Sequence, residues 1–115
     1  MKDLEAVRER AAQFAQARDW EQFHSPKNLV MALSVEVAEL MEHFQWLSEA
    51  EAEQLADDKR VQVANEVADV QVYLVRLADR LGIDILTAVE NKMRENELKY
   101  PAERVRGSAK KYSEY

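Results

Sequence analysis

The chain contains only two glycines and two prolines in 115 residues. These residue types mark most turns, so a chain poor in both has few places to reverse its direction. Ala, Leu, Glu, Gln, Arg and Val are abundant, and most of them favour helices. We therefore predict an all-α protein with long helices. The length suits one domain with a real core, so we predict a single domain over residues 1–115, with a basic tail from about residue 101.

Apolar residues recur at steps of three and four and predict the helices. Ser25-Pro26 is a strong helix start, Ser48 and Glu51 fit a capping box, and Gly82 suits the left-handed position after a helix end. Asp84 is the expected cap of the next helix, which should stop at Pro101. The predicted helices cover about residues 3–18, 25–46, 48–56, 57–81 and 85–99.

Two short acidic segments resemble each other and begin thirty residues apart, Glu36-Val37-Ala38-Glu39-Leu40 and Glu66-Val67-Ala68-Asp69-Val70. On a helix, acids three residues apart project from one face. If the two helices pack side by side, four carboxylates converge, and this arrangement is costly unless a cation binds. A divalent metal such as Mg²⁺ is the natural occupant. The alternative to a shared metal site, which the pattern favours equally, is two ordinary acid pairs at the edge of the core.

The connector at residues 18–26 is rich in aromatic and polar side chains and lacks helical periodicity. Trp20, Phe23 and His24 in so short a loop suggest a ligand site. The simpler interpretation is that Trp20 and Phe23 plug the end of the helical bundle.

Apolar residues on the second and third long helices extend beyond the single face that a monomeric bundle needs. This excess predicts contacts between subunits. On the last long helix, Lys92, Asn96 and Lys99 form a row that could hold phosphate oxygens, although such rows are usually solvated.

Charge and composition exclude several classes of function. The net charge of −6 argues against a general nucleic-acid binder. Cysteine is absent, which excludes disulfides and zinc-thiolate sites. No apolar run approaches the roughly 18 residues that a membrane span needs, and no signal peptide is evident. We expect a cytoplasmic protein without a membrane or polynucleotide partner.

Several of these segments, taken in order, resemble the MazG-like, all-α nucleoside triphosphate pyrophosphohydrolases, and most of all their dCTP pyrophosphatase branch. The resemblance extends from about Phe14 to Tyr112. It rests on the segment Arg18-Asp19-Trp20-Glu21-Gln22-Phe23-His24, both acid pairs, Phe44-Gln45-Trp46, Tyr73, and Lys92-Met93 through Asn96 to Tyr100-Pro101. Many relatives have an additional Glu immediately before Glu36, where this chain has Val35.

The resemblance implies Mg²⁺-dependent hydrolysis of a nucleoside triphosphate, dCTP or a modified dCTP above all, to the monophosphate and pyrophosphate. It also implies a four-helix bundle whose paired dimers form a homotetramer. The residues that match the catalytic, metal-binding acids are Glu36, Glu39, Glu66 and Asp69, and our working assignment for the general base is Glu39. The residues that match base- and sugar-enclosing positions are Trp20, His24, Trp46 and Tyr73. Those that match phosphate-facing positions are Lys92, Asn96, Lys110, Lys111 and Tyr112.

Three alternatives remain open. A ferritin-like iron or manganese bundle would need Glu-x-x-His pairs, and neither His24 nor His43 follows a glutamate by three residues. A non-enzymic helical interaction module would explain the wide apolar faces but not the acid pairs. A related pyrophosphohydrolase, such as one acting on phosphoribosyl-ATP, would use another nucleotide.

Overall fold

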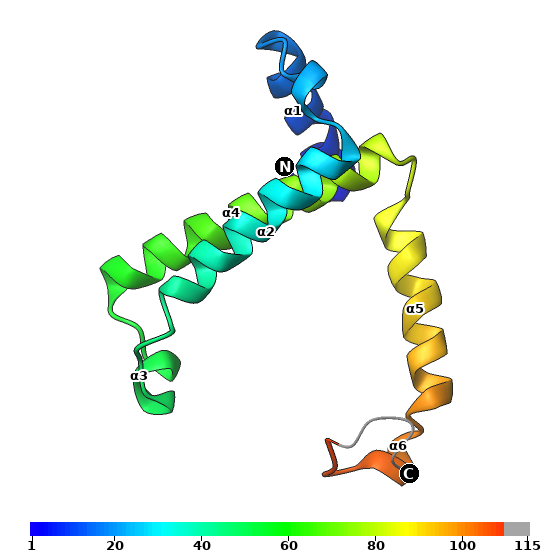
Figure 1. The fold of residues 1–115 in the computed structure, drawn as a ribbon. Coiled ribbons are helices and arrows are strands. Elements are labelled where there is room, and N and C mark those ends of the chain that lie inside the picture. Colours follow the sequence, from blue (N-terminus) through cyan, green and yellow to red (C-terminus); the bar gives the residue numbers. More distant parts are fainter. Residues whose placement is uncertain (110–115) are drawn as a thin grey trace. The chain divides into compact units, whose positions relative to one another are not determined.

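The computed structural model describes residues 1–109, which are helical without any strand (Figure 1). The prediction of an all-α chain is therefore confirmed over this range. The predicted phosphate-facing residues Lys110, Lys111 and Tyr112 lie outside the described residues. The elements are α1 (Leu4–Ala17), the 3₁₀ turn η1 (Glu21–Phe23), α2 (Pro26–Glu42), α3 (Glu49–Glu53), α4 (Asp57–Arg80), α5 (Ile85–Lys99) and α6 (Ala102–Val105).

The chain divides into two compact units. The first unit, residues 1–83, holds α1 to α4, and the second begins at Asp84 and holds α5 and α6. The single-domain organisation and the four-helix bundle, which would need α5 beside the other helices, stay predictions.

The first unit is built on a helical hairpin. The helices α2 and α4 run antiparallel side by side, and α1 packs against α4 (Figure 1). Its most buried apolar side chains are Ala15 of α1, Leu29 of α2, and Val75 and Ala78 of α4. These residues join all three helices near the start of α2 and the end of α4.

The predicted helix starts and stops are largely confirmed. The Ser25 hydroxyl accepts a hydrogen bond from the Asn28 amide at 3.2 Å. Ser48 and Glu51 form the reciprocal capping box that opens α3. Gly82 has φ of 67° just past α4, in the left-handed region that L side chains avoid.

Among the predicted helix ends, that of α2 was wrong. The helix α2 ends at Glu42 rather than near Trp46. The Phe44 amide donates to the Met41 carbonyl at 2.9 Å, and the Leu47 amide donates to the Phe44 carbonyl at 3.0 Å. The segment after α2 therefore forms tight turns. Asp84 occupies the N-cap position of α5, as predicted, and its carboxylate accepts from the Thr87 hydroxyl at 2.9 Å rather than from a backbone amide.

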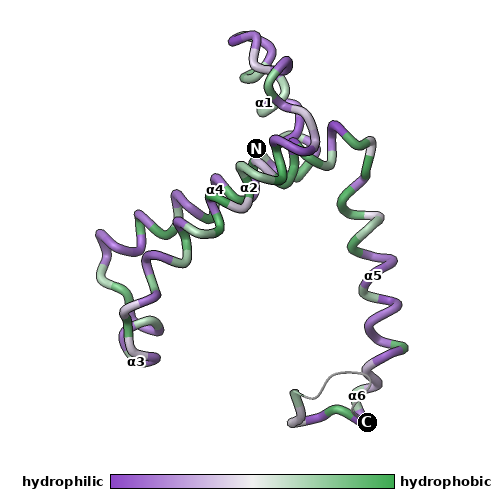
Figure 2. Tube along the Cα trace, in the orientation of Figure 1, coloured by the Kyte–Doolittle hydropathy of each residue, from purple (hydrophilic) through white to green (hydrophobic). Residues whose placement is uncertain are grey.

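Apolar surface remains uncovered within the first unit. Hydrophobic and hydrophilic segments alternate along α2 and α4 (Figure 2). The large apolar side chains at least two-fifths exposed include Val30, Met31, Val35 and Met41 of α2 and Val67 and Val72 of α4. The predicted apolar excess is therefore present, while the subunit contacts that it suggests stay a prediction. Within residues 1–109, no helix is long and apolar enough to span a membrane.

Candidate active site

Three carboxylates from the two hairpin helices meet between α2 and α4. Glu36 and Glu39 come from α2, and Glu66 comes from α4. Each offers one oxygen, and these three oxygens all lie within 4.8 Å of one another. Because acids three residues apart share a helix face, the antiparallel packing brings one predicted pair against the other. Asp69 is close enough for its charge to act on Glu36, although it is not part of this group.

Burial and like charge both act on Glu36. Burial, the neighbouring carboxyls of Glu66 and Glu39, and the charges of Glu39 and Asp69 raise the pKa of Glu36 to about 7. One oxygen of Glu36 and one of Glu66 are buried and find no hydrogen-bond partner within the described chain. Ionised carboxylates are costly in such a setting.

A cation between these carboxylates would remove that cost. The donor set consists only of carboxylate oxygens, which suits a hard divalent ion such as Mg²⁺ better than a soft metal. The three glutamates could therefore hold a divalent metal ion, and their two orphaned oxygens are what such an ion would satisfy.

A pocket of about 380 Å³ adjoins the part of α4 that carries Asp69. Its volume lies in the range of small-molecule sites. Most of its wall is apolar, with Asp69, Arg10 and Arg76 as charged members. The lining residues are Met1, Val7, Arg10, Ala11, Phe14, Ala15, Trp20, His24, Asp69, Val72, Tyr73 and Arg76.

Aromatic rings form one side of this pocket. Trp20 meets Phe14 edge to face, with ring centroids 5.7 Å apart, and its ring lies 6.4 Å from that of His24. The guanidinium of Arg18 covers the Phe14 ring at 3.6 Å. These contacts hold Trp20, which is 44% exposed, at the pocket wall, where a flat ligand could stack on it.

Asp69 connects the pocket with the carboxylate group. It lines the pocket, and its negative charge contributes to the raised pKa of Glu36. Tyr73 lies one helical turn further along α4 and also lines the pocket. The carboxylate group and the aromatic pocket are therefore adjacent along one face of α4.

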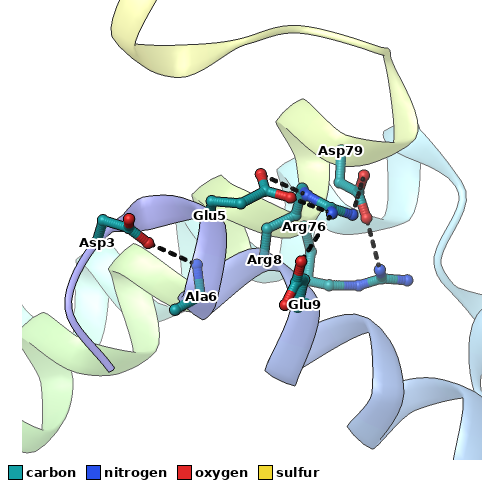
Figure 3. A network of polar contacts seen from close by, with 7 residues as sticks. All are labelled: Asp3, Glu5, Ala6, Arg8, Glu9, Arg76 and Asp79. Carbon is teal, nitrogen blue, oxygen red and sulfur yellow. Dashed lines mark hydrogen bonds and ion pairs between the residues drawn. The ribbon is translucent and has the colours of Figure 1, made fainter.

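A chain of charged groups ties His24 to α4 and α1. Nη2 of Arg76 lies 3.4 Å from Nδ1 of His24, and Nη1 of Arg76 lies 3.4 Å from Asp79. Asp79 in turn lies 3.5 Å from Nη1 of Arg8 (Figure 3). Burial and the positive charges of Arg76 and Arg80 lower the pKa of His24. The lowered pKa favours the neutral imidazole.

Comparison with protein families identifies the chain. The model of the MazG-like family matches residues 31–115. The chain belongs to the MazG-like family. Curated relatives named dCTP pyrophosphatase 1 are 48% identical in Rattus norvegicus and 45% identical in Homo sapiens, each over 113 residues. These matches cover 96% of this chain and 66% of each relative, so the chain spans just under two-thirds of their length.

A solved structure has the same helical fold as this MazG-like chain. The crystal structure of a pyrophosphatase from Archaeoglobus fulgidus superimposes with a TM-score of 0.80 at 41% sequence identity. The match covers 84% of this chain and 91% of that one. The helical fold is thus shared with a solved pyrophosphatase.

The structure brings together some of the residues predicted for a MazG-like site but not all of them. Trp20, His24 and Tyr73 line the pocket. Trp46 does not line it, and it is 87% exposed in the turns after α2. The alternative role of Phe23 as a plug was wrong, because its side chain is 60% exposed.

Lys92 and Asn96 lie on α5 in the second unit. Lys92 lies 3.5 Å from Glu95, an ion pair between exposed side chains. Their predicted role toward phosphate, like the substrate role of Trp46, stays a prediction.

Sequence reasoning missed the contribution of α1 and of Arg76 to the pocket. Five residues of α1 line it, and none had been singled out as ligand-facing. For Arg76 a signal existed, because it follows Tyr73 by three residues and Asp69 by seven and so shares their helix face. A charged residue in that stripe, directly after Val75, is unusual enough to mark a site.

Proposed function

We propose that this MazG-like chain is a Mg²⁺-dependent nucleoside triphosphate pyrophosphohydrolase that converts dCTP, or a modified dCTP, to the monophosphate and pyrophosphate. The names of the curated relatives support this activity and substrate. The observation that carries the proposal is the group of three carboxylates with two orphaned buried oxygens, next to a pocket with an aromatic wall. A nucleotide has both an anionic and a flat apolar part, and this arrangement offers a place for each.

Glu36, Glu39 and Glu66 are the residues that would hold the metal, with Asp69 as the fourth acid at its edge. When bound, Mg²⁺ neutralises triphosphate charge and activates water for attack on phosphorus. The protein supplies positioning and electrostatic stabilisation, which dominate this type of transfer. We propose that Glu39, besides holding the metal, accepts the proton of the attacking water as the general base.

The pocket serves the nucleoside in this proposal. Trp20 stacks on the base, Tyr73 closes the side next to Asp69, and His24 offers a polar group in an otherwise largely apolar wall. Lys92 and Asn96 of α5, and Lys110, Lys111 and Tyr112 of the tail, are proposed to contact phosphate, and Trp46 to contact the base.

The assembly proposed for this enzyme is a homotetramer made of two paired dimers. Its support is the exposed apolar surface on both hairpin helices, which exceeds what a single helical face would need. Homo-oligomers with closed symmetry bury such faces against copies of themselves.

The test is pyrophosphate release from a panel of ribo- and deoxyribonucleoside triphosphates, with Mg²⁺ and with excess chelator. We expect metal-dependent release that is highest for dCTP or its 5-substituted forms. Glu39→Gln and Asp69→Asn should fold and assemble yet lose this turnover. Glu42→Gln, an exposed acid on the same helix as Glu39, is the matched control. Full activity in both active-site variants would refute the proposed site.

A second candidate function is a helical interaction module, and the exposed apolar faces are the observation that favours it. Light scattering separates the two candidates. A closed homo-oligomer formed by the chain alone uses these faces and removes the motive for this alternative. A monomer that releases no pyrophosphate from any nucleotide would support it.

A further inference from the structure

A buried arginine lies in the pocket wall, and the proposed hydrolysis does not by itself require it. Arg76 of α4 is only 3% exposed, which is rare for an arginine. Its Nη1 lies 3.4 Å from Asp79 and its Nη2 lies 3.4 Å from Nδ1 of His24. Asp79 is also paired with Arg8 of α1, so the arginine is held from a second helix (Figure 3). Such a buried, oriented guanidinium calls for a functional explanation.

The contact with His24 determines where the imidazole carries its proton. An arginine side chain donates hydrogen bonds and never accepts them. Nδ1 of His24 must therefore be the acceptor of the contact with Arg76, and the neutral ring carries its single proton on Nε2.

The surroundings of His24 keep it neutral. Burial comes first, followed by the positive charges of Arg76 and Arg80 on α4, and together they outweigh Glu21 of η1, so that its pKa is lowered. On the pocket side, Arg10 of α1 and Asp69 of α4 join Arg76 as the charged residues that line the same space as His24. Burial and these charges therefore favour the neutral ring, which the acceptor role of Nδ1 also requires.

We propose that Arg76 is a positioning residue that holds His24 in the Nε2-protonated tautomer, so that the ring presents an N–H donor to an acceptor oxygen of the bound nucleotide. Because Nδ1 is engaged by Arg76, Nε2 is the ring nitrogen left to meet a ligand in the pocket that His24 lines. The assignment of the acceptor rests on the proposed function, whereas the tautomer does not. A donor fixed in this way loses little freedom on binding, which favours a ligand with an acceptor at that position.

The first test is a ¹⁵N NMR spectrum of the ring nitrogens in the metal-free protein at pH 8. The chain has only two histidines, and His24→Gln identifies the signals of the ring. We expect a single tautomer of His24 with the proton on Nε2. A proton on Nδ1, or an even mixture of both tautomers, in the wild-type protein would overturn the proposal without any mutation of Arg76.

The second test compares three variants. Arg76→Met removes the donor, Arg76→Lys keeps a donor and the charge, and Arg80→Met removes a nearby charge that has no hydrogen bond to His24 within the described structure. We expect Arg76→Met to mix the tautomers and raise KM for dCTP about three- to tenfold, the loss of one hydrogen bond, with kcat within about twofold. Arg76→Lys should largely restore both, and Arg80→Met should keep the tautomer and KM.

The outcomes distinguish this proposal from the proposed function. Wild-type ring signals in Arg76→Met, or the same KM change in Arg80→Met, would refute the positioning role. If Arg76→Met does not fold, the proposal is tested by the tautomer in the wild-type spectrum and by whether Arg76→Lys keeps a KM near that of the wild type. An Nε2-protonated His24 in a protein that hydrolyses no nucleotide would refute the proposed enzyme and its nucleotide acceptor while leaving the tautomer assignment intact.

Discussion

Replacing Glu36 with glutamine should stabilise the metal-free protein at alkaline pH. The pKa of Glu36 is raised from 4.5 to about 7. Since one pKa unit corresponds to about 1.4 kcal/mol, a shift of this size is worth up to about 3 kcal/mol. The Glu36 side chain is only partly buried, and solvent screening reduces that figure. We expect Glu36→Gln to raise the free energy of unfolding at pH 8 by about 1–3 kcal/mol.

The sign follows from the proton balance. The folded protein holds the Glu36 proton at pH values where the unfolded chain has already released it. The unfolding free energy of the wild type therefore falls as pH rises from about 4.5 to about 7. The Glu36→Gln variant has no such proton to lose, so this part of the slope should be absent from its profile.

The assay is urea unfolding followed by circular dichroism, in chelator, at pH 5 and pH 8 and at one fixed protein concentration. Glu42→Gln, the exposed acid on the same helix, is the control and should follow the wild type. At a hundredfold excess over Kd, Mg²⁺ should stabilise the wild type by about 2.7 kcal/mol and Glu36→Gln by less. A Glu36→Gln protein with the wild-type pH slope, or with no advantage at pH 8, would show that burial and the neighbouring carboxylates do not disfavour the ionised form of Glu36 as described.

Three further perturbations test other parts of the structure. In the proposed enzyme, Trp20→Ala should raise KM for dCTP about five- to 150-fold, since stacking of a base on an aromatic ring is worth about 1–3 kcal/mol; initial rates check this, with the exposed Phe23→Ala as control. Gly82→Ala should cost about 1 kcal/mol in urea unfolding through its φ of 67° alone, because an added Cβ meets nothing within 4 Å; no loss would exclude strain there. Ser48→Ala should remove the capping box with Glu51 and speed amide exchange in α3, at a cost of about 1 kcal/mol, and unchanged exchange would contradict this.

The helices and the carboxylate group could be predicted because the information for them is local. Scarcity of glycine and proline, together with apolar periodicity, leaves helices as the main option for such a chain. The caps at Ser25 and Ser48 act on amides three residues away. Glu36 and Glu39 share a face because of helix geometry alone, and the same holds for Glu66 and Asp69.

The pocket wall could not be predicted in the same way because it depends on contacts between distant segments. Arg8 and Asp79, which join α1 to α4, are 71 residues apart in the sequence. The apolar stripe of α1 indicates that Ala15 would be buried, but nothing within α1 indicates that Phe14 would lie against Trp20. The end of α2 was missed for a different reason, because the apolar pattern continues through Leu47 while the backbone has already left the helix.

The carboxylate group and the pocket are built from different sets of helices, so substitutions can change one without changing the other. The carboxylate group is built from α2 and α4, whereas the described pocket is built from α1, the connector and α4, and no residue of α2 lines it. Substitutions at Val7, Ala11 or Phe14 can therefore reshape the pocket without touching the carboxylate group. In the proposed enzyme, selectivity can drift among nucleotides through α1 while the hydrolytic machinery of the hairpin is inherited unchanged.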